Sequence, residues 1–275
     1  MPAALPRLFA IVMLALGICM SAHAGDIAVA RPTSTVAGTS KIGVVEAGIE
    51  YHSLSADLGE WKGGYVRGIW FASPKSVVNY ELVDTRRFGA HGRYASIGLT
   101  QTLDDRWYAS AALGAGNGAF FFPDWRVDVA VNRKWGADRS LITTLGFTQY
   151  NAPDGHVDRT ALLGLTWYAP GKWVLEGGWR PNRSSPGAVH STSGYLAGTW
   201  GEEGRQYVSL RHERGREAYQ TIGADILLVD FPSRVSSLTW RRWLTSRCGF
   251  NLRAERYDNP SYRRNGMELG GFCGF

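Results

Sequence analysis

The chain has 275 residues, a formal net charge of +6 and 44% hydrophobic residues. Beyond Ala24 it contains no apolar run of about eighteen residues, which excludes helices that span a membrane. Its three cysteines are too few for a small disulfide-rich scaffold. The basic residues are mostly arginines spread along the chain rather than gathered in one segment, so nucleic acid is not an expected partner.

The first segment has the pattern of an export signal. Arg7 precedes an apolar stretch, Leu8–Met20, and Ala22-His23-Ala24 forms a small-x-small cleavage site. We therefore expect residues 1–24 to be removed. The next segment, 25–40, is rich in small residues and lacks periodicity, which predicts a flexible periplasmic lead-in.

From residue 41 to residue 275 polar and apolar side chains alternate with a period of two. In the first such segment Val45, Ala47 and Ile49 share one face of a predicted strand. The pattern predicts about fourteen strands, with twelve or sixteen as alternatives. The expected strands are Val44–Tyr51, Trp61–Ser73, Ser76–Phe88, His91–Thr102, Arg106–Gly116, Asp124–Trp135, Arg139–Tyr150, Val157–Ala169, Lys172–Arg183, Ser191–Trp200, Gly204–Arg216, Ser233–Leu244, Cys248–Asp258 and Arg263–Phe275.

The connections between these segments alternate in length. Gly136–Arg139 and Pro170–Lys172 are tight turns, whereas Asn117–Pro123 and Asn151–His156 are longer. This alternation is typical of a barrel with periplasmic turns and extracellular loops. The fold class is therefore all-β, an antiparallel transmembrane β-barrel of the bacterial outer membrane.

Aromatic residues gather near the short turns. Tryptophan and tyrosine at this height predict a girdle at the lipid headgroups. The expected members are Trp70, Trp107, Tyr108, Trp135, Trp167, Tyr168, Trp173, Trp200, Trp240 and Trp243.

Charged residues recur on the strand face opposite the apolar row. Because a charge facing hydrocarbon costs about 2–4 kcal/mol, we expect this face to line the lumen. The predicted lumen-lining residues are Glu46, Glu50, Glu81, Arg126, Asp128, Lys134, Glu176, Arg180, Arg253, Glu255 and Glu268. They fit either an open conduit for a polar solute or an internal salt-bridge network that plugs the barrel.

The end of the chain carries two further expectations. Phe275 closes a strand with a lipid-facing aromatic side chain, which predicts an insertion signal for the barrel-assembly machinery. Cys248 and Cys273 lie at equal distances from the centre of the last predicted hairpin. We therefore expect them to be neighbours that form a disulfide.

The segment Glu217–Pro232 is too apolar for a loop that is free in water. One interpretation is a loop folded into the pore, with Asp225, Asp230 and Phe231 forming a constriction. The other is that Ile226–Phe231 extends the following strand above the membrane.

The extracellular ends of the strands are rich in arginine and histidine. Phosphate groups of lipopolysaccharide are the expected partners of the arginines, since arginine binds phosphate in a bidentate manner. These arginines are Arg86, Arg87, Arg93, Arg183, Arg214, Arg216, Arg256, Arg263 and Arg264.

The histidines allow a third function, a hydrolase at the barrel rim. A positioned histidine can activate water or a hydroxyl group there. The residues are His52, His91, His156, His190 and His212, with Asp154 and Asp158 near His156 and Ser191 and Ser193 near His190. No known enzyme spacing occurs among them, so no catalytic residue is assigned, and neither a metal ion nor a cofactor is expected.

Several short motifs together resemble the YaiO-type outer-membrane β-barrel family. They are VVEAG at Val44–Gly48, WKG at Trp61–Gly63, WYAS at Trp107–Ser110, NRKW at Asn132–Trp135, GREAYQ at Gly215–Gln220, LVDF at Leu228–Phe231, RAERY at Arg253–Tyr257, Asn259-Pro260 and Asn265-Gly266.

The resemblance implies an outer-membrane location and a barrel, and it implies little chemistry. Relatives join such a barrel to periplasmic helical repeats, an arrangement similar to that of exopolysaccharide exporters. The leading expectation is therefore a channel or secretion conduit for a polar solute or polysaccharide, served by a periplasmic partner. The competing expectation is a structural or adhesion barrel with a plugged lumen.

Overall fold

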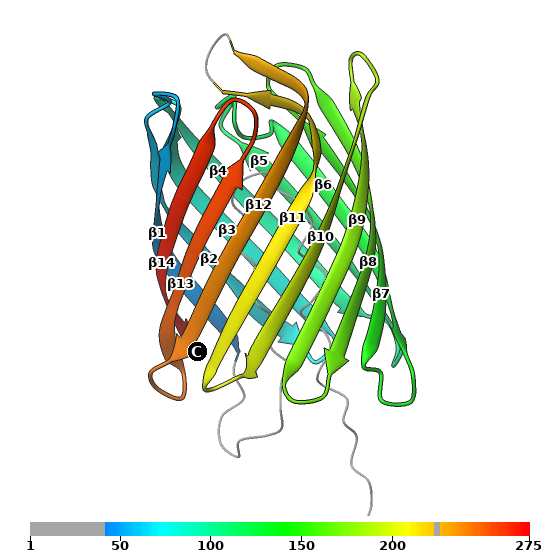
Figure 1. Cartoon of the computed structure of the whole chain (residues 1–275). Helices are drawn as coiled ribbons and strands as arrows, with labels where there is room; N and C mark the ends of the chain where they lie inside the picture. The colour runs from blue at the N-terminus through cyan, green and yellow to red at the C-terminus, as the bar shows by residue number, and fades with distance from the viewer. Residues whose placement is uncertain (1–41, 223–225) are drawn as a thin grey trace, which may run out of the picture.

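The computed structural model describes residues 42–222 and 226–275. The expected signal segment and lead-in lie outside these residues. Within them, fourteen antiparallel strands form a closed barrel in which each strand pairs with its neighbour in the sequence and β14 returns to β1 (Figure 1). No helix among the described residues is long and apolar enough to cross a membrane.

The strands match the expected segments closely, except for β11 and β12. They are β1 (Gly43–Leu54), β2 (Glu60–Ser73), β3 (Ser76–Arg87), β4 (Ala90–Thr102), β5 (Trp107–Gly116), β6 (Trp125–Trp135), β7 (Leu141–Asn151), β8 (Val157–Ala169), β9 (Trp173–Ser185), β10 (Val189–Glu202), β11 (Gln206–Thr221), β12 (Leu227–Trp243), β13 (Cys248–Asp258) and β14 (Arg263–Gly274).

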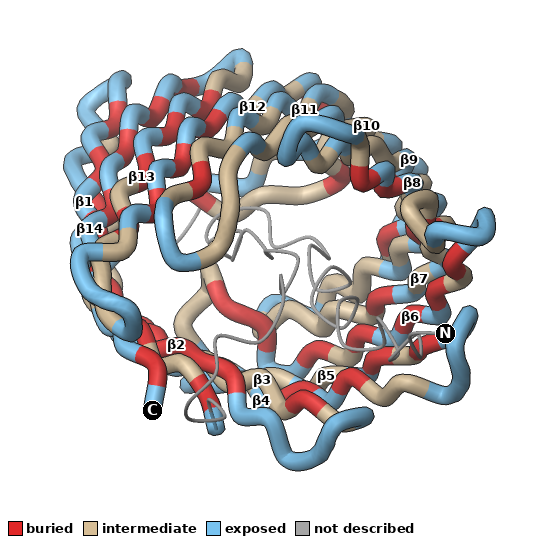
Figure 2. Tube along the Cα trace, turned by 90° about the horizontal axis from the view of Figure 1, so that it is seen from below, coloured by how far each residue is buried: buried red, intermediate tan, exposed pale blue. Residues whose placement is uncertain are grey.

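Burial alternates residue by residue along the strands, as it must where one face meets lipid and the other meets the lumen. In β14 every second residue is exposed, from Arg263 through Met267 to Cys273, and the residues between them are buried. The ring seen along the barrel axis shows the same alternation (Figure 2). Lipid-facing side chains such as Leu163 and Leu210 therefore surround a polar interior.

Tight turns close the end of the barrel at which the C-terminus lies (Figure 1). Gly136 and Gly171 adopt φ angles of 81° and 74°, which favour glycine because it lacks a Cβ atom. In the β4–β5 turn, a carboxylate oxygen of Asp104 accepts backbone N–H bonds from Arg106 at 2.6 Å and Trp107 at 2.8 Å. These two donors hold the pKa of the Asp104 carboxyl below its usual range.

The aromatic girdle is present but smaller than expected. Trp135, Trp167 and Trp240 are exposed on the outer face, as are the other girdle tryptophans except Trp243. Tyr108 and Tyr168 were placed wrongly, because both are buried in the lumen against Ile142.

Trp243 also faces inward, where its ring lies 5.0 Å from that of Phe272. These three residues lie at girdle height, but each occupies the inward register of its strand. The distance of a residue from a turn therefore predicts its depth in the membrane, but it does not predict which face of the strand the residue occupies.

Candidate functional site

The predicted lumen-lining residues all occupy inward positions of their strands. The buried ones are Glu46, Glu50, Arg126, Asp128, Lys134, Arg180, Arg253, Glu255 and Glu268. Glu81 and Glu176 are half-buried. The inward side chains form two walls of the lumen, which differ in side-chain size and charge.

The first wall, formed by β1–β3 and β12–β14, is an ionic network. At its centre Glu46 accepts bonds from Arg67 at 2.6 Å, Arg241 at 2.7 Å and Asn251 at 3.3 Å. The three donors come from β2, β12 and β13, so the network spans the seam where β1 meets β14. A buried carboxylate is stabilised only when such partners replace its lost hydration.

A second group of ion pairs lies nearer the extracellular mouth. Arg264 donates to Glu255 at 2.6 Å, and Arg253 donates to the same carboxylate at 2.9 Å. The guanidinium of Arg87 lies 3.6 Å from Glu50. Because Arg87 and Arg264 are buried in the lumen, the expectation that these two arginines face lipopolysaccharide is wrong.

The second wall, along β7, β8 and β10, carries several short inward side chains beside larger ones such as Leu162 and Tyr195, which pack together. Inward positions there hold Thr144, Gly164, Ser193 and Ala197, and all of them remain half-buried. An inward residue keeps exposed surface only where no other side chain covers it. Other side chains of the described residues therefore leave these four inward positions partly uncovered.

Hydrogen bonds along the second wall join hydroxyl and amide groups to one another and to the Asp158 carboxylate, which accepts from Asn182 at 3.1 Å. Thr160 donates to the Asn182 side chain at 2.8 Å, and Asn182 in turn donates to Ser191 at 3.2 Å. The charges nearby are compensated within the wall. Arg180 donates to Glu213 at 2.8 Å.

The extracellular mouth carries aromatic residues that the sequence analysis missed. Phe122, in the loop between β5 and β6, is buried and stacks on Tyr94 at 5.4 Å between ring centroids. The Arg87 guanidinium lies 5.1 Å from the Phe122 ring and 5.0 Å from the Trp61 ring. The loop must approach β4 closely, since a Cβ atom at Gly92 would lie 2.6 Å from the ring of Phe121.

Ring contacts continue across the mouth toward β13 and β14. Phe88 lies 5.0 Å from Trp61 and 6.3 Å from Tyr262, between ring centroids. We call the set Trp61, Phe88, Phe120, Phe121, Phe122, Tyr257 and Tyr262 the aromatic cap. Three consecutive phenylalanines in an expected loop were the available sequence signal, since such a loop is too apolar to remain in water.

The expected constriction loop is a strand hairpin. Strand β11 continues to Thr221 and β12 begins at Leu227, and these two residues are paired. The extended-strand interpretation is therefore the observed one. Phe231 is buried, but Asp230 is exposed and accepts a bond from Arg216 at 2.8 Å, so Asp230 does not narrow the pore. Asp225 lies outside the described residues.

The histidines do not gather into one rim site. His52 lies at the extracellular end opposite Trp61, but it faces inward and is buried 3.8 Å from Glu50. His156 lies 2.9 Å from Asp154, with its ring 4.1 Å from that of Tyr219. His190 is exposed whereas Ser191 is buried, because neighbouring residues of β10 face opposite sides.

Two further observations bear on catalysis and metal binding. His212 and Ser236 lie 2.9 Å apart on the lipid-facing wall, but no carboxylate of the described chain orients this histidine. Ser193 donates to Glu213 at 3.0 Å rather than to a histidine. Among residues 42–222 and 226–275, no group of three His, Cys, Asp or Glu side chains is arranged to hold a metal ion.

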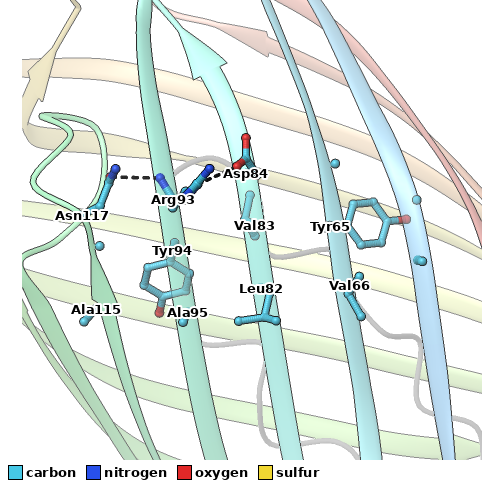
Figure 3. A pocket seen from close by; sticks show the side chains of 14 residues that line it. Tyr65, Val66, Leu82, Val83, Asp84, Arg93, Tyr94, Ala95, Ala115 and Asn117 are labelled. Atoms are coloured by element: carbon cyan, nitrogen blue, oxygen red, sulfur yellow. Dashed lines mark hydrogen bonds and ion pairs between the residues drawn. The ribbon is translucent and has the colours of Figure 1, made fainter.

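Arginines on the outer face differ in how they are compensated. Arg93 of β4 donates to Asp84 at 2.8 Å, and Asp84 also contacts His91 at 2.7 Å. These residues border a shallow groove of about 710 Å³ beside the outward side chains Val66 and Leu82 (Figure 3). The other expected outer arginines are exposed, namely Arg86, Arg183, Arg214, Arg216, Arg256 and Arg263.

The two cysteines are joined in the structure. Cys248 and Cys273 are cross-strand partners in the β13–β14 hairpin, with Cα atoms 4.1 Å apart and a bond between their sulfurs. Phe275 is exposed, and its backbone carbonyl accepts an N–H bond from Ile42 at 2.6 Å.

Solved structures of other β-barrels share this fold. CymD, a monoaromatic hydrocarbon channel, has a TM-score of 0.59 at 5% identity, covering 86% of this chain and 89% of its own. The toluene transporter TodX of P. putida has a TM-score of 0.54 at 10% identity, covering 86% and 91%. A bacterial polysaccharide outer membrane secretin has a TM-score of 0.50 at 8% identity, covering 86% and 100%.

At these identities the likeness concerns the fold. No curated protein matches the chain. The sequence signature of the YaiO membrane beta barrel domain matches residues 43–220, which is most of the barrel. The chain is thus a β-barrel of the bacterial outer membrane and belongs to the YaiO membrane β-barrel domain family.

Proposed function

We propose that this barrel is a channel for polar, hydroxyl-rich solutes, with polysaccharide as the larger cargo. The observation that carries the proposal is the second wall of the lumen, where hydroxyl and amide side chains form a hydrogen-bonded network and short inward residues such as Thr144 and Ser193 are half-buried. Hydroxyl and amide groups there can exchange hydrogen bonds with the hydroxyl groups of a sugar.

Lumen chemistry, rather than fold, selects among the cargoes of similar barrels. CymD and TodX are named for aromatic hydrocarbons, whereas the secretin of similar fold is named for polysaccharide. The Thr160, Asn182 and Ser191 network and the ion pairs of this lumen suit a polar solute better than a hydrocarbon. Export of a polysaccharide would also need a periplasmic partner that delivers it to the lower end of the barrel.

The alternative is a structural or adhesion barrel with a blocked lumen. The observation that favours it is the ionic wall around Glu46 together with the aromatic cap, since both fill space with paired side chains. Such a barrel would carry no ionic current and would admit no sugar.

Conductance in planar bilayers distinguishes the two functions. Ala197 faces inward on the second wall and Leu196, its neighbour in β10, faces lipid with 74% exposure. We expect the purified protein to conduct, Ala197→Trp to lower the conductance by narrowing the open side, and Leu196→Trp to leave it unchanged. In parallel, liposome swelling should show entry of oligosaccharides that are excluded from protein-free liposomes.

The absence of any current and of any swelling from folded protein would reject the channel. Equal conductance in the Ala197→Trp and Leu196→Trp proteins would reject the assignment of the open side to β7, β8 and β10.

A further inference from the structure

Outward side chains of β11–β14 change from apolar to cationic toward the extracellular end. One row of cross-strand neighbours consists of Leu210, Leu238, Ala254 and Met267. Two residues nearer the extracellular end of each strand, the row is His212, Ser236, Arg256 and Asn265. The next row is Arg214, Arg234, Asp258 and Arg263. This order reproduces the change from acyl chains to charged headgroups in a lipid leaflet.

The charges of the last rows do not balance. Asp258 accepts from Arg263 at 2.9 Å and from Arg256 at 3.1 Å, and Arg234 lies 3.5 Å from it. Arg214 stands directly opposite Arg234 across the β11–β12 pair and has no ion-pair partner in the described part of the chain. Three guanidiniums thus share one carboxylate and a fourth, that of Arg214, stands beside them, which leaves an excess of three positive charges.

Such an excess favours an anion from outside the protein. Like charges directly opposite each other across two strands are destabilising unless a counter-charge lies between them. The guanidiniums of Arg234, Arg256 and Arg263 are more than half exposed, so they remain accessible to a ligand. Phosphate is the anion whose geometry arginine matches best.

We propose that Arg214, Arg234, Arg256 and Arg263, arranged around Asp258, bind the phosphate groups of a lipopolysaccharide molecule in the outer leaflet. We call these five residues the arginine patch. The row Leu210, Leu238, Ala254 and Met267 lies beside the acyl chains of the same molecule. A lipid whose phosphates contact the arginine patch and whose acyl chains contact the apolar row fits both sets of residues, whereas free phosphate can contact only the arginines.

The opposite side of the barrel provides a matched contrast. There Arg93 is paired with Asp84, which leaves no comparable excess of charge (Figure 3). Arg93 lies at the same end of the barrel and is similarly exposed, so Arg93→Gln removes one positive charge without touching the arginine patch.

The test measures binding of purified lipid A to the folded barrel in detergent. Lipid A that carries both phosphates is compared with enzymatically dephosphorylated lipid A and with inorganic phosphate alone. We expect the protein with Arg234→Gln, Arg256→Gln and Arg263→Gln together to bind bisphosphorylated lipid A at least about tenfold more weakly, since it loses three charge-assisted bonds to phosphate. The Arg93→Gln protein should bind bisphosphorylated lipid A as tightly as the unaltered protein does. Dephosphorylated lipid A should bind weakly to the unaltered protein, to the triple variant and to the Arg93→Gln protein.

Folding is verified for each protein by the gel shift between boiled and unboiled samples. Arg234→Gln and Arg256→Gln alone provide single changes that disturb the wall least, and each should weaken binding measurably. Undiminished binding by the folded single and triple variants, or binding independent of the lipid A phosphates, would overturn the proposal. Saturation of the patch by inorganic phosphate with the affinity of lipid A would overturn the lipid as its occupant.

Discussion

Glu46 shows how a single buried residue can hold the seam of the barrel together. Its carboxylate lies between two guanidiniums, those of Arg67 and Arg241, and all three groups are buried. Glu46→Gln would leave two positive charges facing a neutral amide. We expect it to lower the free energy of unfolding by about 3–5 kcal/mol, the usual effect of breaking a buried ion pair. Equilibrium unfolding in urea, followed by tryptophan fluorescence in lipid vesicles, measures this quantity.

An exposed pair provides the control for this substitution. Glu60 contacts Lys62 on the outer surface, where water already solvates both groups. Glu60→Gln should therefore leave the unfolding curve unchanged. If the two substitutions destabilised the barrel equally, the burial of the Glu46 carboxylate would not be the cause.

At this scale the sequence predicted which residues line the lumen but misplaced some of their neighbours. Residue parity along a strand identified Glu46 and Glu255 as inward. The arginines at the extracellular strand ends were instead all predicted to face outward, because only their position along the barrel axis was considered. Arg263 and Arg264 are adjacent, however, and must face opposite sides of the strand. One aromatic partner of Arg264, Tyr257, is its cross-strand neighbour in β13, but the other, Trp61, lies on β2 beyond the β1–β14 seam, and no local pattern connects it with Arg264.

The β13–β14 hairpin is fixed covalently at its lower end. Cys248 and Cys273 are separated by 25 residues, and a bond across that interval lowers the entropy of the unfolded chain. Replacing both cysteines with serine should reduce the free energy of unfolding by about 3 kcal/mol. The same urea titration measures the effect, and added reductant should abolish the difference between the two proteins. A difference that persists in reductant would mean that the disulfide is not its source.

The loop between β5 and β6 is the second element with a testable role. Phe122→Ala removes the ring that stacks on Tyr94 and should free the loop from the inner wall. We expect single-channel conductance to rise, whereas Trp125→Ala, which removes an outward aromatic residue nearby, should not alter it. A fall or no change in the Phe122→Ala conductance would show that the loop does not limit passage.

Most elements were predictable because each strand is an independent period-two segment between turn residues. The exception is the β11–β12 hairpin, whose strands extend farther than expected. Two of its apolar upper residues, Ile222 and Leu228, pack against the cluster of Trp61, Tyr257 and Tyr262, whereas Leu227 and Val229 remain exposed. This packing brings together residues that are far apart in the sequence, so the sequence of the hairpin alone could not predict it.

The inward side chains differ between the two sides of the barrel. The ionic wall and the aromatic cap lie on β1–β5 and β12–β14, whereas β7, β8 and β10 carry fewer charges and several short inward side chains. The sequence predicted a closed barrel from repeated short and long connections. It did not predict this asymmetry, since the arrangement of side chains across the interior depends on which strands face one another.

The seam between the first and last strands governs how this protein can be delivered. Residues from Val44 to Leu54 find their second set of backbone partners only in β14. Until that strand arrives, an inserted sheet would present bare N–H and C=O groups to hydrocarbon at a cost of several kcal/mol each. Insertion therefore requires the free edge of β1 to be paired or shielded from hydrocarbon until β14 arrives.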